Sequence, residues 1–286
     1  MSITITTSNV NGLRAADRKG IGEWAKGHAP DVWCLQEVRA PQPDVDRIVG
    51  ALGFDYAQSG RIADPTGLAS MNEVCRIRGR AGVALLTTLP VVGRRYGLPG
   101  LGEDVDTGRW IEADLRTPTG AVITVVCVYV HAGNADDPVK MGQKYRFLEA
   151  MLARLGQLRD QAASDGPQVV LCGDFNIAHT PLDIKNAKAN EKHSGFLPQE
   201  RAYVDRWLDE YGLVDVVRGL AGEVQGPYTW WSQRGRAFDN DVGWRIDYQF
   251  ATPRLARAAQ GFAIDKAPSY EARWSDHAPL SVTYDL

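Results

Sequence analysis

Runs of apolar and β-branched residues recur along the whole chain and predict many short strands. Residues 3–10 alternate β-branched and polar side chains, whereas residues 32–38 and 169–172 are almost continuously apolar, as in strands buried on both faces. The same reasoning predicts strands at residues 83–88, 122–130, 228–232, 245–251 and 280–285.

Helical periodicity is confined to fewer segments. Apolar residues recur every three or four positions in residues 17–27, 44–52 and 140–159. A fourth helix is expected to begin near Pro198, because proline is favoured in a first helical turn, and to end before Gly212. The helices are scattered among more numerous strands, which predicts packed β-sheets flanked by helices rather than a regular alternation of strand and helix.

Length and composition are those of an ordinary globular protein. The chain has 286 residues, 44% of them hydrophobic, and no repeat or linker divides it, so we expect one domain spanning residues 1–286. The apolar runs are too short to cross a membrane and no secretory signal is visible, which favours a cytoplasmic location. Nothing indicates an obligate dimer, so we expect a monomer. Four cysteines, none at zinc-ligand spacing, are expected to be reduced. The net charge of −3 argues against a protein that coats nucleic acid non-specifically, but not against a DNA enzyme with a local basic face.

Candidate chemistry lies in polar residues at the ends of predicted strands, where sheet scaffolds present functional side chains. These residues are Asn9, Asn11, Glu37, Tyr129, Asp174, Asn176, Asp247, Asp276 and His277. Taken singly, most have a structural explanation, such as turn formation for the asparagines or a core position for Tyr129. The acid in GDFN is harder to explain in this way, because a carboxylate directly after a long apolar strand must be solvated or paired.

If the strand ends converge, four of these carboxylates crowd one cleft. Like charges a few ångströms apart raise one another's pKa unless a cation joins them. Oxygen ligands without thiolates suit Mg²⁺, Mn²⁺ or Ca²⁺ rather than Zn²⁺. A phosphodiesterase needs such a cation beside a base, since the metal neutralises charge on the phosphate while the base activates a water molecule.

Seven motifs then resemble, in order, those of the exonuclease III family of abasic-site endonucleases. They are SNVNGLR, LQEVR, YVHAG, GDFNIAHTPLDI, GFLPQER, WRIDYQF and SDHAPL, and they span nearly the whole chain. That family belongs to a wider endonuclease/exonuclease/phosphatase group with deoxyribonuclease I. GDFN and SDHAP also fit the wider group, whereas GFLPQER and GWRIDY are more particular to its DNA-repair branch. The resemblance implies an α/β fold, a four-layered sandwich of two packed mixed β-sheets flanked by helices.

The resemblance also implies an activity and a site. The expected activity is Mg²⁺-dependent hydrolysis of duplex DNA 5′ to abasic sites, with 3′–5′ exonuclease and 3′-end cleaning activity, and Mn²⁺ is an alternative metal. Carried over position by position, the metal site contains Glu37, Asn9, Asn11 and Asp276, and the catalytic residues are Tyr129, Asp174, Asn176, Asp247 and His277. Asp174 would activate the attacking water, and His277, oriented by Asp247, would contact the scissile phosphate. This ion pair would favour an imidazolium, which stabilises the charge that develops on phosphorus.

Residues that match the family's apolar pocket, Trp230, Trp244 and Ile246, would accept an extruded sugar without a base and exclude a complete nucleotide. Further DNA contacts are expected from Asn186, Asn190, His193, His131, Arg109, Lys140 and Arg234. Four basic clusters could bind phosphates: Arg76, Arg78 and Arg80; Lys140, Lys144 and Arg146; Lys185, Lys188 and Lys192; and Arg234, Arg236 and Arg245.

Two positions depart from the family pattern. Many members have a carboxylate where this chain has Asn11, so its metal site carries one charge fewer. The loop after Tyr129 usually continues with proline and an amide, whereas here it reads His131, Ala132, Gly133. We hypothesise that His131 replaces the missing amide as a phosphate donor. The altered loop leaves the balance of endonuclease and exonuclease activity open.

Two alternatives remain at this stage. A phosphatase or phosphodiesterase that acts on a lipid or a small molecule would share the catalytic set but lack the basic clusters and GFLPQER. A non-catalytic DNA-binding module would retain the basic residues without a working metal centre. Divalent-metal binding and the salt dependence of DNA binding separate these readings.

Overall fold

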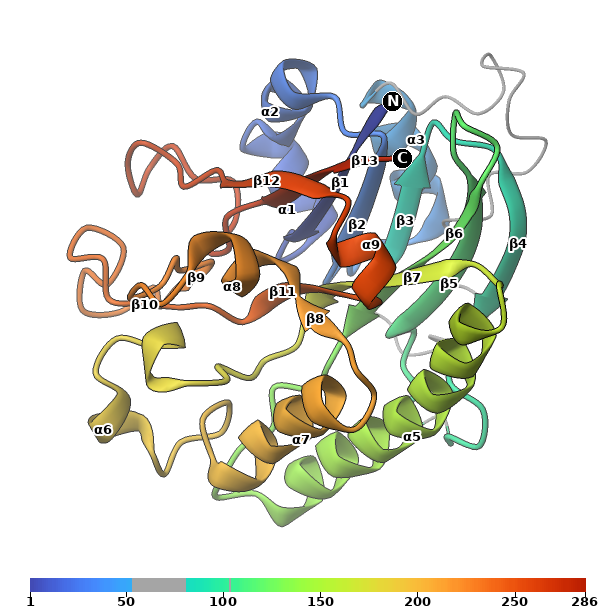
Figure 1. Ribbon diagram of the computed structural model, residues 1–286. Coiled ribbons are helices and arrows are strands. Elements are labelled where there is room, and N and C mark those ends of the chain that lie inside the picture. The colour runs from blue at the N-terminus through green and yellow to red at the C-terminus, as the bar shows by residue number, and fades with distance from the viewer. Residues whose placement is uncertain (53–80, 103) are drawn as a thin grey trace.

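Two β-sheets form the centre of the protein in the computed structural model, which describes residues 1–52, 81–102 and 104–286 (Figure 1). The first sheet has the strand order β12–β13–β1–β2–β3 and the second has the order β4–β5–β6–β7–β11–β8. The first contains β1 (Ser2–Asn9), β2 (Val32–Gln36), β3 (Ala84–Thr87), β12 (Ala259–Ile264) and β13 (Leu280–Asp285). The second contains β4 (Val91–Tyr96), β5 (Trp110–Arg116), β6 (Val122–Tyr129), β7 (Gln168–Asp174), β8 (Val214–Asp215) and β11 (Asp247–Ala251). Both sheets are mixed, since β1 and β2 are parallel, as are β6 and β7, while the neighbouring pairs are antiparallel.

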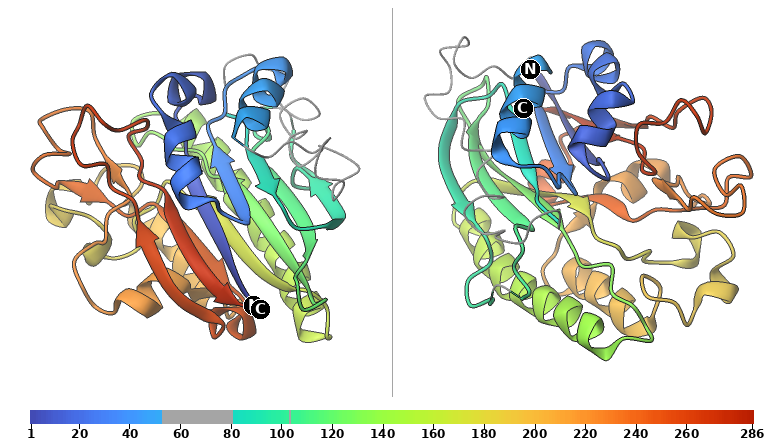
Figure 2. Two further views of the ribbon diagram at one scale, coloured as in Figure 1. Left: turned by 90° about the horizontal axis from the view of Figure 1, so that it is seen from above. Right: turned by 180° about the vertical axis from the view of Figure 1, so that it is seen from behind.

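The two sheets pack face to face, and helices cover their outer faces (Figure 2). The helices α1 (Leu13–Arg18), α2 (Ile21–His28) and α3 (Gln42–Ala51) pack on the first sheet. The second sheet is covered by α5 (Pro138–Ala163) and α7 (Pro198–Asp209). Side chains of both sheets, among them Ile5, Val125 and Val282, form the core between them. The predicted four-layered α/β sandwich is therefore confirmed.

Shorter elements join the strands of this sandwich. They are the 3-10 turn Pro181–Asp183, α6 (Ala187–Asn190), α8 (Val216–Ala221), α9 (Pro253–Ala256) and the two-stranded ribbon of β9 (Trp230–Trp231) and β10 (Gly243–Trp244). The loops around α6, between β9 and β10, and after β12 extend to the same side of the molecule in Figure 1 and in the reverse view of Figure 2. In the part of the chain that the structure describes, no helix combines the length and apolarity needed to cross a membrane.

The sequence pattern predicted the central elements better than the peripheral ones. The helix expected over residues 17–27 is two helices, because Gly20 adopts a left-handed conformation (φ 100°) between them. Five of the described strands, β4, β5, β8, β10 and β12, were not predicted, and β8 and β10 have only two residues each. Strands β4 and β12 lie at sheet edges and are only partly buried, so their polar residues and glycines give no apolar run. In β5 the apolar pattern is interrupted by Glu112 and Asp114, which form ion pairs with Arg95.

The register of the central strands brings the polar strand ends together. Asn9 is paired with Gln36, so Glu37 follows beside it, and Tyr129 is paired with Asp174 across the parallel strands β6 and β7. On the other side of β7, Asp247 is paired with the same Asp174. The strands of two different sheets therefore bring residues at or next to their ends to one place, as expected from the sequence.

Candidate active site

Glu37 occupies the centre of a hydrogen-bonded cluster at the end of β2. Its Oε1 accepts a hydrogen bond from Asn9 Nδ2 at 2.9 Å and another from the Tyr129 hydroxyl at 2.7 Å. The residue has a left-handed backbone conformation (φ 53°), which is uncommon for a side chain of this kind and occurs often at functional sites. Burial, together with the charge of Asp174, raises the pKa of Tyr129 to about 12, so this phenol remains protonated and donates to Glu37.

Asp174 is held by two asparagines. Asn9 Nδ2 also donates to Asp174 Oδ2 at 2.9 Å, which joins this acid to Glu37. The backbone amide of Asn176 donates to Oδ1 at 2.9 Å, and its side-chain amide donates to Oδ2 at 3.2 Å. Asn176 itself has a left-handed backbone conformation (φ 50°). Burial raises the pKa of Asp174 to about 7, against the opposing charge of His277. A carboxylate with this pKa can accept a proton from water at neutral pH.

His277 lies between two carboxylates. Its Nδ1 is 2.8 Å from Asp247 Oδ2, and its Nε2 is 3.9 Å from Asp174 Oδ2. Burial alone would lower the pKa of His277, but the Asp247 ion pair, reinforced by Asp174 and Asp276, raises it to about 9. The ring is therefore an imidazolium at neutral pH, with Nε2 on the side of Asp174. This is the charge state that the sequence predicted for the Asp247–His277 pair.

Asp276, which directly precedes His277 in the chain, connects two other predicted site residues. Its Oδ1 accepts from Asn11 Nδ2 at 2.9 Å and its Oδ2 accepts from Trp230 Nε1 at 3.2 Å. Burial raises the pKa of Asp276, but the charge of His277 and these two hydrogen bonds outweigh it and hold the pKa below its ordinary value. The carboxylate thus remains charged beside the pocket.

The oxygens around Glu37 suit a hard cation. Glu37 Oε2 is buried and accepts no hydrogen bond, and the guanidinium of Arg39 lies against it in an ion pair. Asn11 Oδ1 accepts from the same guanidinium at 3.2 Å, so both oxygens face a positive group. Carboxylate and amide oxygens are the ligands of Mg²⁺ and Mn²⁺. The residues present therefore fit a divalent metal with oxygen ligands.

The four carboxylates of the site do not form one cluster. Among the described residues, no group of three or more histidine, cysteine or carboxylate side chains could hold a metal ion. His277 separates Asp247 from Asp174, and Asn9 bridges Asp174 to Glu37. Neighbouring donors, rather than a shared cation, therefore compensate most of these charges.

A pocket of about 880 Å³ opens in front of these groups. It is lined by thirteen of the predicted site residues: Asn11, Glu37, Tyr129, Asp174, Asn176, Asn190, His193, Trp230, Arg234, Trp244, Ile246, Asp276 and His277. Trp230 and Trp244 meet edge to face, with ring centroids 5.9 Å apart, and Trp230 lies 6.4 Å from the His277 ring. The pocket thus joins an apolar wall to the acids and the imidazolium.

Nearly the whole chain matches known proteins. The family model for the endonuclease/exonuclease/phosphatase family matches residues 6–277. The chain is 31% identical to an exodeoxyribonuclease of Bacillus subtilis over 97% of this chain and 98% of that protein. The chain belongs to the endonuclease/exonuclease/phosphatase family.

Solved structures of this family have the same fold. An AP endonuclease from Archaeoglobus fulgidus is 27% identical, with a TM-score of 0.77 over 99% of this chain and 100% of that one. A 3′ phosphatase from Neisseria, bound to a product DNA hairpin, is 26% identical, with a TM-score of 0.77 over 99% and 100% of the two chains. Nucleases of this family depend on a divalent metal ion. The predicted family and enzyme class are confirmed, and the chain is a nuclease of this family.

Some residues that were predicted to contact DNA do not line the pocket of this family member. His131 is buried, and its Nε2 lies 2.8 Å from the carbonyl oxygen of Val105. Burial and the charge of Arg109 lower the pKa of His131 to about 3, so the ring is neutral and its one proton is used in this bond. The hypothesis that His131 donates to a phosphate is therefore wrong. Arg109 stacks on the Tyr129 ring at 4.5 Å, outside the pocket lining.

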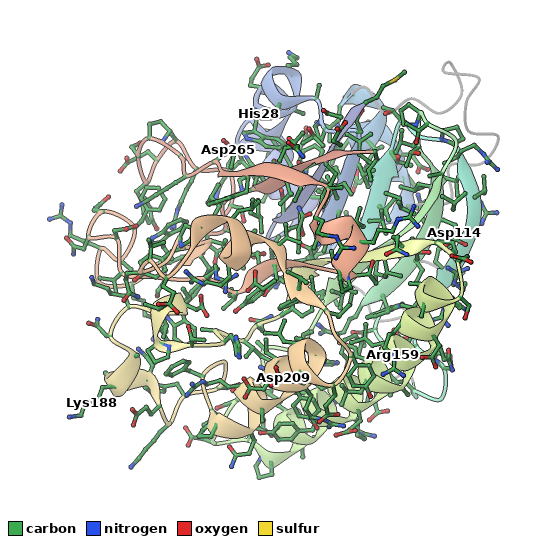
Figure 3. The ribbon with its side chains drawn as sticks, viewed as in Figure 1. His28, Asp114, Arg159, Lys188, Asp209 and Asp265 are labelled. Atoms are coloured by element: carbon green, nitrogen blue, oxygen red, sulfur yellow. The ribbon has the colours of Figure 1, made fainter. Side chains whose placement is uncertain are left out.

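The basic clusters also divide into exposed and buried members. Lys144 and Arg245 were expected to contact phosphates, but both are buried and form ion pairs with carboxylates, so these two predictions are wrong. Lys140 is exposed near Asp137, and Lys188 projects from α6 into solvent (Figure 3). The surface residues also include Asn186, which adopts a left-handed conformation before α6. The predicted cluster of Arg76, Arg78 and Arg80 lies outside the described residues.

The sequence did not predict two features of the site. Arg39, within LQEVR, lines the pocket and contacts Glu37 and Asn11, and its position two residues after the predicted metal ligand was the available signal. The second feature is the fully buried pair of Lys144 and Glu200, with 2.6 Å between Nζ and Oε1. Both residues belong to helices, where their charges suggested exposed positions.

The Lys144–Glu200 pair connects the loops that carry the pocket lining. Lys144 Nζ donates to the carbonyl oxygens of Ala132 at 3.2 Å and Asn176 at 2.9 Å. Glu200 accepts from the backbone amide of Gly195 at 2.6 Å and from the Ser194 hydroxyl at 3.0 Å. One buried ion pair thus ties together three loops, those after β6, after β7 and before α7. Because Asn176 holds Asp174, this pair also supports the position of the acid.

Proposed function

We propose that this nuclease hydrolyses the backbone of duplex DNA 5′ to abasic sites, and that it also removes nucleotides and blocking groups from 3′ ends. The observation that carries the proposal is one pocket in which the Asp174–His277–Asp247 array faces the apolar wall of Trp230 and Trp244. The relatives named exodeoxyribonuclease and AP endonuclease support the choice of DNA as substrate.

The cofactor that we propose is Mg²⁺, with Mn²⁺ as an alternative. Glu37 would be its principal ligand, with Asn9 and Asn11 beside it and Asp276 nearby. When bound, the metal would supply positive charge to the scissile phosphate and to the leaving oxygen. The oxygens that face the Arg39 guanidinium, Glu37 Oε2 and Asn11 Oδ1, support this assignment.

The roles of the chain's own residues follow from their hydrogen bonds. Asp174, held by Asn9 and Asn176, would take a proton from the attacking water, to which its pKa of about 7 is suited. The imidazolium of His277 would stabilise the negative charge that develops on the phosphate oxygens, and Asp247 keeps it protonated. The Tyr129 phenol would orient Glu37 and lie within reach of the phosphate or the leaving group.

Selection of an abasic site would depend on the shape of the pocket. A flipped sugar without a base would lie against Trp230, Trp244 and Ile246, whereas the base of a complete nucleotide would clash with this wall. Of the predicted DNA contacts, Asn190, His193 and Arg234 line the same pocket, together with Lys185, and could bind the flanking phosphates. Exposed residues such as Lys140 would add contacts along the duplex.

The decisive experiment uses a 5′-labelled duplex with one abasic-site analogue, beside an undamaged duplex of the same sequence. Each is incubated with protein and Mg²⁺, with EDTA, and with the Asp174→Asn variant. A single cut at the lesion that EDTA and the variant abolish is the expected result. Asp160→Asn, at an exposed position on α5, is the matched control and should cut normally.

Other outcomes would redirect the assignment. A ladder of shortening on both duplexes would indicate an enzyme that is mainly an exonuclease. If folded protein cuts neither duplex, the substrate is not DNA, and lipid and small-molecule phosphates would be tested next. Calorimetry with Mg²⁺ and Mn²⁺, comparing wild type with Glu37→Gln, separates an enzyme from a non-catalytic DNA-binding module, because only the enzyme should bind metal through Glu37. A single domain over residues 1–286, a monomeric state and a cytoplasmic location stay predictions from the sequence.

A further inference from the structure

Arg245 lies between two residues of the pocket wall but points away from the pocket. Trp244 and Ile246 line the pocket, whereas Arg245 does not, as expected for alternating side chains in an extended segment. The Arg245 side chain is 1% exposed. A guanidinium that is buried directly behind an apolar wall requires compensation, and its partners show what it holds in place.

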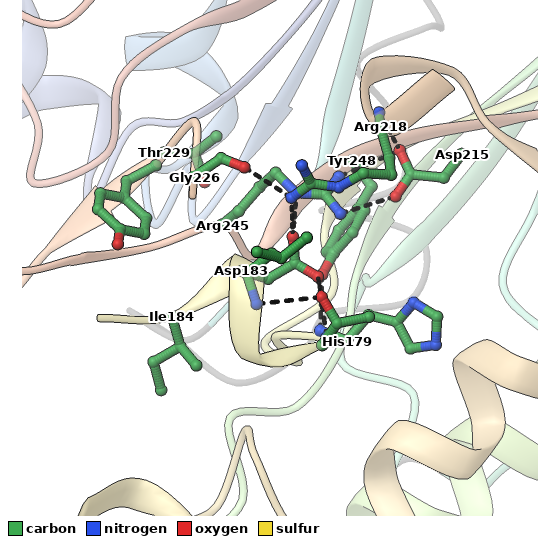
Figure 4. A network of polar contacts seen from close by, with 12 residues as sticks. His179, Asp183, Ile184, Asp215, Arg218, Gly226, Thr229, Arg245 and Tyr248 are labelled. Atoms are coloured by element: carbon green, nitrogen blue, oxygen red, sulfur yellow. Dashed lines mark hydrogen bonds and ion pairs between the residues drawn. The ribbon is translucent and has the colours of Figure 1, made fainter. Parts of the chain in front are cut away.

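Two carboxylates and an aromatic ring surround this guanidinium (Figure 4). Its Nε donates to Asp183 Oδ1 at 2.7 Å, and its two terminal nitrogens lie 3.1 and 2.8 Å from the oxygens of Asp215. The guanidinium carbon lies 4.4 Å from the centroid of the Tyr248 ring. The planar guanidinium of Arg245 therefore joins Asp183, in the 3-10 turn, to Asp215, at the start of α8.

Asp183 fixes the chain segment that continues the pocket surface beside this wall. The backbone amide of Arg245 donates to the Asp183 carbonyl at 2.7 Å, and the amide of Lys185 donates to the Gly243 carbonyl at 3.0 Å. Ile184 forms a β-bridge with Trp244 between these bonds. The Asp183 carboxylate also accepts from the backbone amide of Thr180 at 2.9 Å. The side-chain ion pair thus reinforces a short ladder that binds residues 181–185 to the strand of the aromatic wall.

Residues 181–196 carry much of the remaining pocket surface. Ile184 and Phe196 pack with Ile246 in one apolar cluster, on which Trp230 and Trp244 rest. Lys185, Asn190 and His193 line the pocket from this segment. Residues 181–196 attach to the aromatic wall at Trp244, and Arg245 and Asp183 secure this attachment. The position of the segment relative to the wall is therefore set there.

We propose that Arg245 is a specificity-determining positioning residue, whose ion pairs with Asp183 and Asp215 set the width of the pocket between residues 181–196 and the Trp244–Ile246 wall. This proposal rests on the proposed function, since it concerns the preference for a sugar without a base. A looser attachment lets residues 181–196 move outward, so that a complete nucleotide enters more easily and an abasic sugar is held less firmly. Arg245 itself touches no substrate.

The test compares Arg245→Lys and Arg245→Met with wild type. Lysine keeps the charge but cannot reproduce the fork that reaches both carboxylates, and methionine removes the charge. The dissociation constants of a duplex with a tetrahydrofuran abasic-site analogue and of an undamaged duplex are measured by fluorescence anisotropy in EDTA. Cleavage of the same two duplexes is then measured with Mg²⁺. We expect both variants to lose about tenfold or more of the discrimination between the duplexes, because displacements of about 1 Å affect catalysis on that scale.

The control for a merely structural effect is Arg154→Met. Arg154 is also largely buried, and both of its bonds to Glu112 measure 2.7 Å, but it lies on α5 away from the pocket. This variant should lose thermal stability yet discriminate like wild type. If the Arg245 variants do not fold, Asp215→Asn serves instead, since it removes one charge of the array and preserves its shape.

The outcomes separate the two proposals. Folded Arg245 or Asp215 variants that discriminate as well as wild type would overturn the role of Arg245. If Arg154→Met loses as much discrimination as Arg245→Lys, the effect follows stability alone and the proposal also fails. Wild-type protein that does not distinguish the two duplexes would instead refute the proposed selection of abasic sites.

Discussion

The substitution Lys144→Met tests whether a buried ion pair supports the catalytic loops. Lys144 is 0% exposed, and its three hydrogen-bonding directions are used by Ala132, Asn176 and Glu200. Burial lowers the pKa of Lys144, whereas Glu200 acts to keep it charged. The variant leaves Glu200 as a buried carboxylate without its cation, which typically costs about 3–5 kcal/mol of the free energy of unfolding.

The double variant Lys144→Met/Glu200→Gln separates charge from packing. A neutral glutamine can still accept hydrogen bonds from the amides of Gly195 and Leu197, which now bond to Glu200. The double variant should therefore be more stable than Lys144→Met alone, with a coupling energy of about 1–3 kcal/mol. Urea unfolding followed by circular dichroism measures all four members of the cycle. Lys140→Met, an exposed position on the same helix, should change stability by at most about 1 kcal/mol.

Activity should not recover with stability. In both variants the Asn176 carbonyl loses the Lys144 ammonium, so the amides that hold Asp174 become less well placed. We expect kcat on an abasic-site duplex to fall about tenfold or more, even where the protein is fully folded. If Lys144→Met unfolds at the same urea concentration as wild type, the assigned ion pair is wrong. If the double variant cleaves at the wild-type rate, the pair stabilises the fold without positioning the acid.

Four other predictions follow from the site. The profile of kcat/KM against pH should rise through about pH 7, as Asp174 loses its proton, and fall through about pH 9, as His277 loses its proton. The variant Asp247→Asn should move the alkaline limb to lower pH, because the Asp247 charge raises the pKa of His277. The same raised pKa means that His277 contributes stability below about pH 6.5 that is lost as the pH rises through about 9, which urea unfolding across this range would detect. Tyr129→Phe removes the 2.7 Å hydrogen bond to Glu37 and should lower kcat about tenfold to a hundredfold, and an unchanged kcat would show that the phenol has no part in the reaction. The logarithm of the DNA-binding constant should fall steeply with the logarithm of salt concentration, and Lys185→Ala should reduce that slope by about 1, whereas a flat response would exclude phosphate contacts.

The central strands were predictable because burial on both faces leaves a strong apolar signal. The segments around Val125 and Val170 are almost continuously apolar, and the acids that follow them could be recognised as strand-end residues. The motifs around these acids then indicated the family. The edge strands β4 and β12 gave no such signal, since their residues are only partly buried and do not form an apolar run.

Charged residues that are buried in the fold were the harder part of the prediction. Lysine and arginine are the residue types expected to bind phosphates, and nothing in the neighbouring sequence shows that Lys144 and Arg245 are buried. Their partners, Glu200 and Asp183, are 56 and 62 residues away in the chain, so the pairing depends on the tertiary fold. The position of His131 had the same difficulty, because the Val105 carbonyl that fixes its ring belongs to a separate loop.

The balance of charge in the pocket explains why metal and DNA binding should reinforce each other. His277 compensates Asp247 and Arg39 compensates Glu37, but Asp276 remains charged at neutral pH, and Asp174, with a pKa of about 7, contributes part of another negative charge. A phosphodiester brings a further negative charge close to these carboxylates, so a cation that enters with it favours its binding there, in addition to Lys185 and Arg234 in the same pocket. Positive coupling of this kind is reciprocal, and each ligand must raise the affinity for the other by the same factor. An overall charge of −3 is therefore compatible with a nuclease that binds DNA more strongly when its metal site is filled.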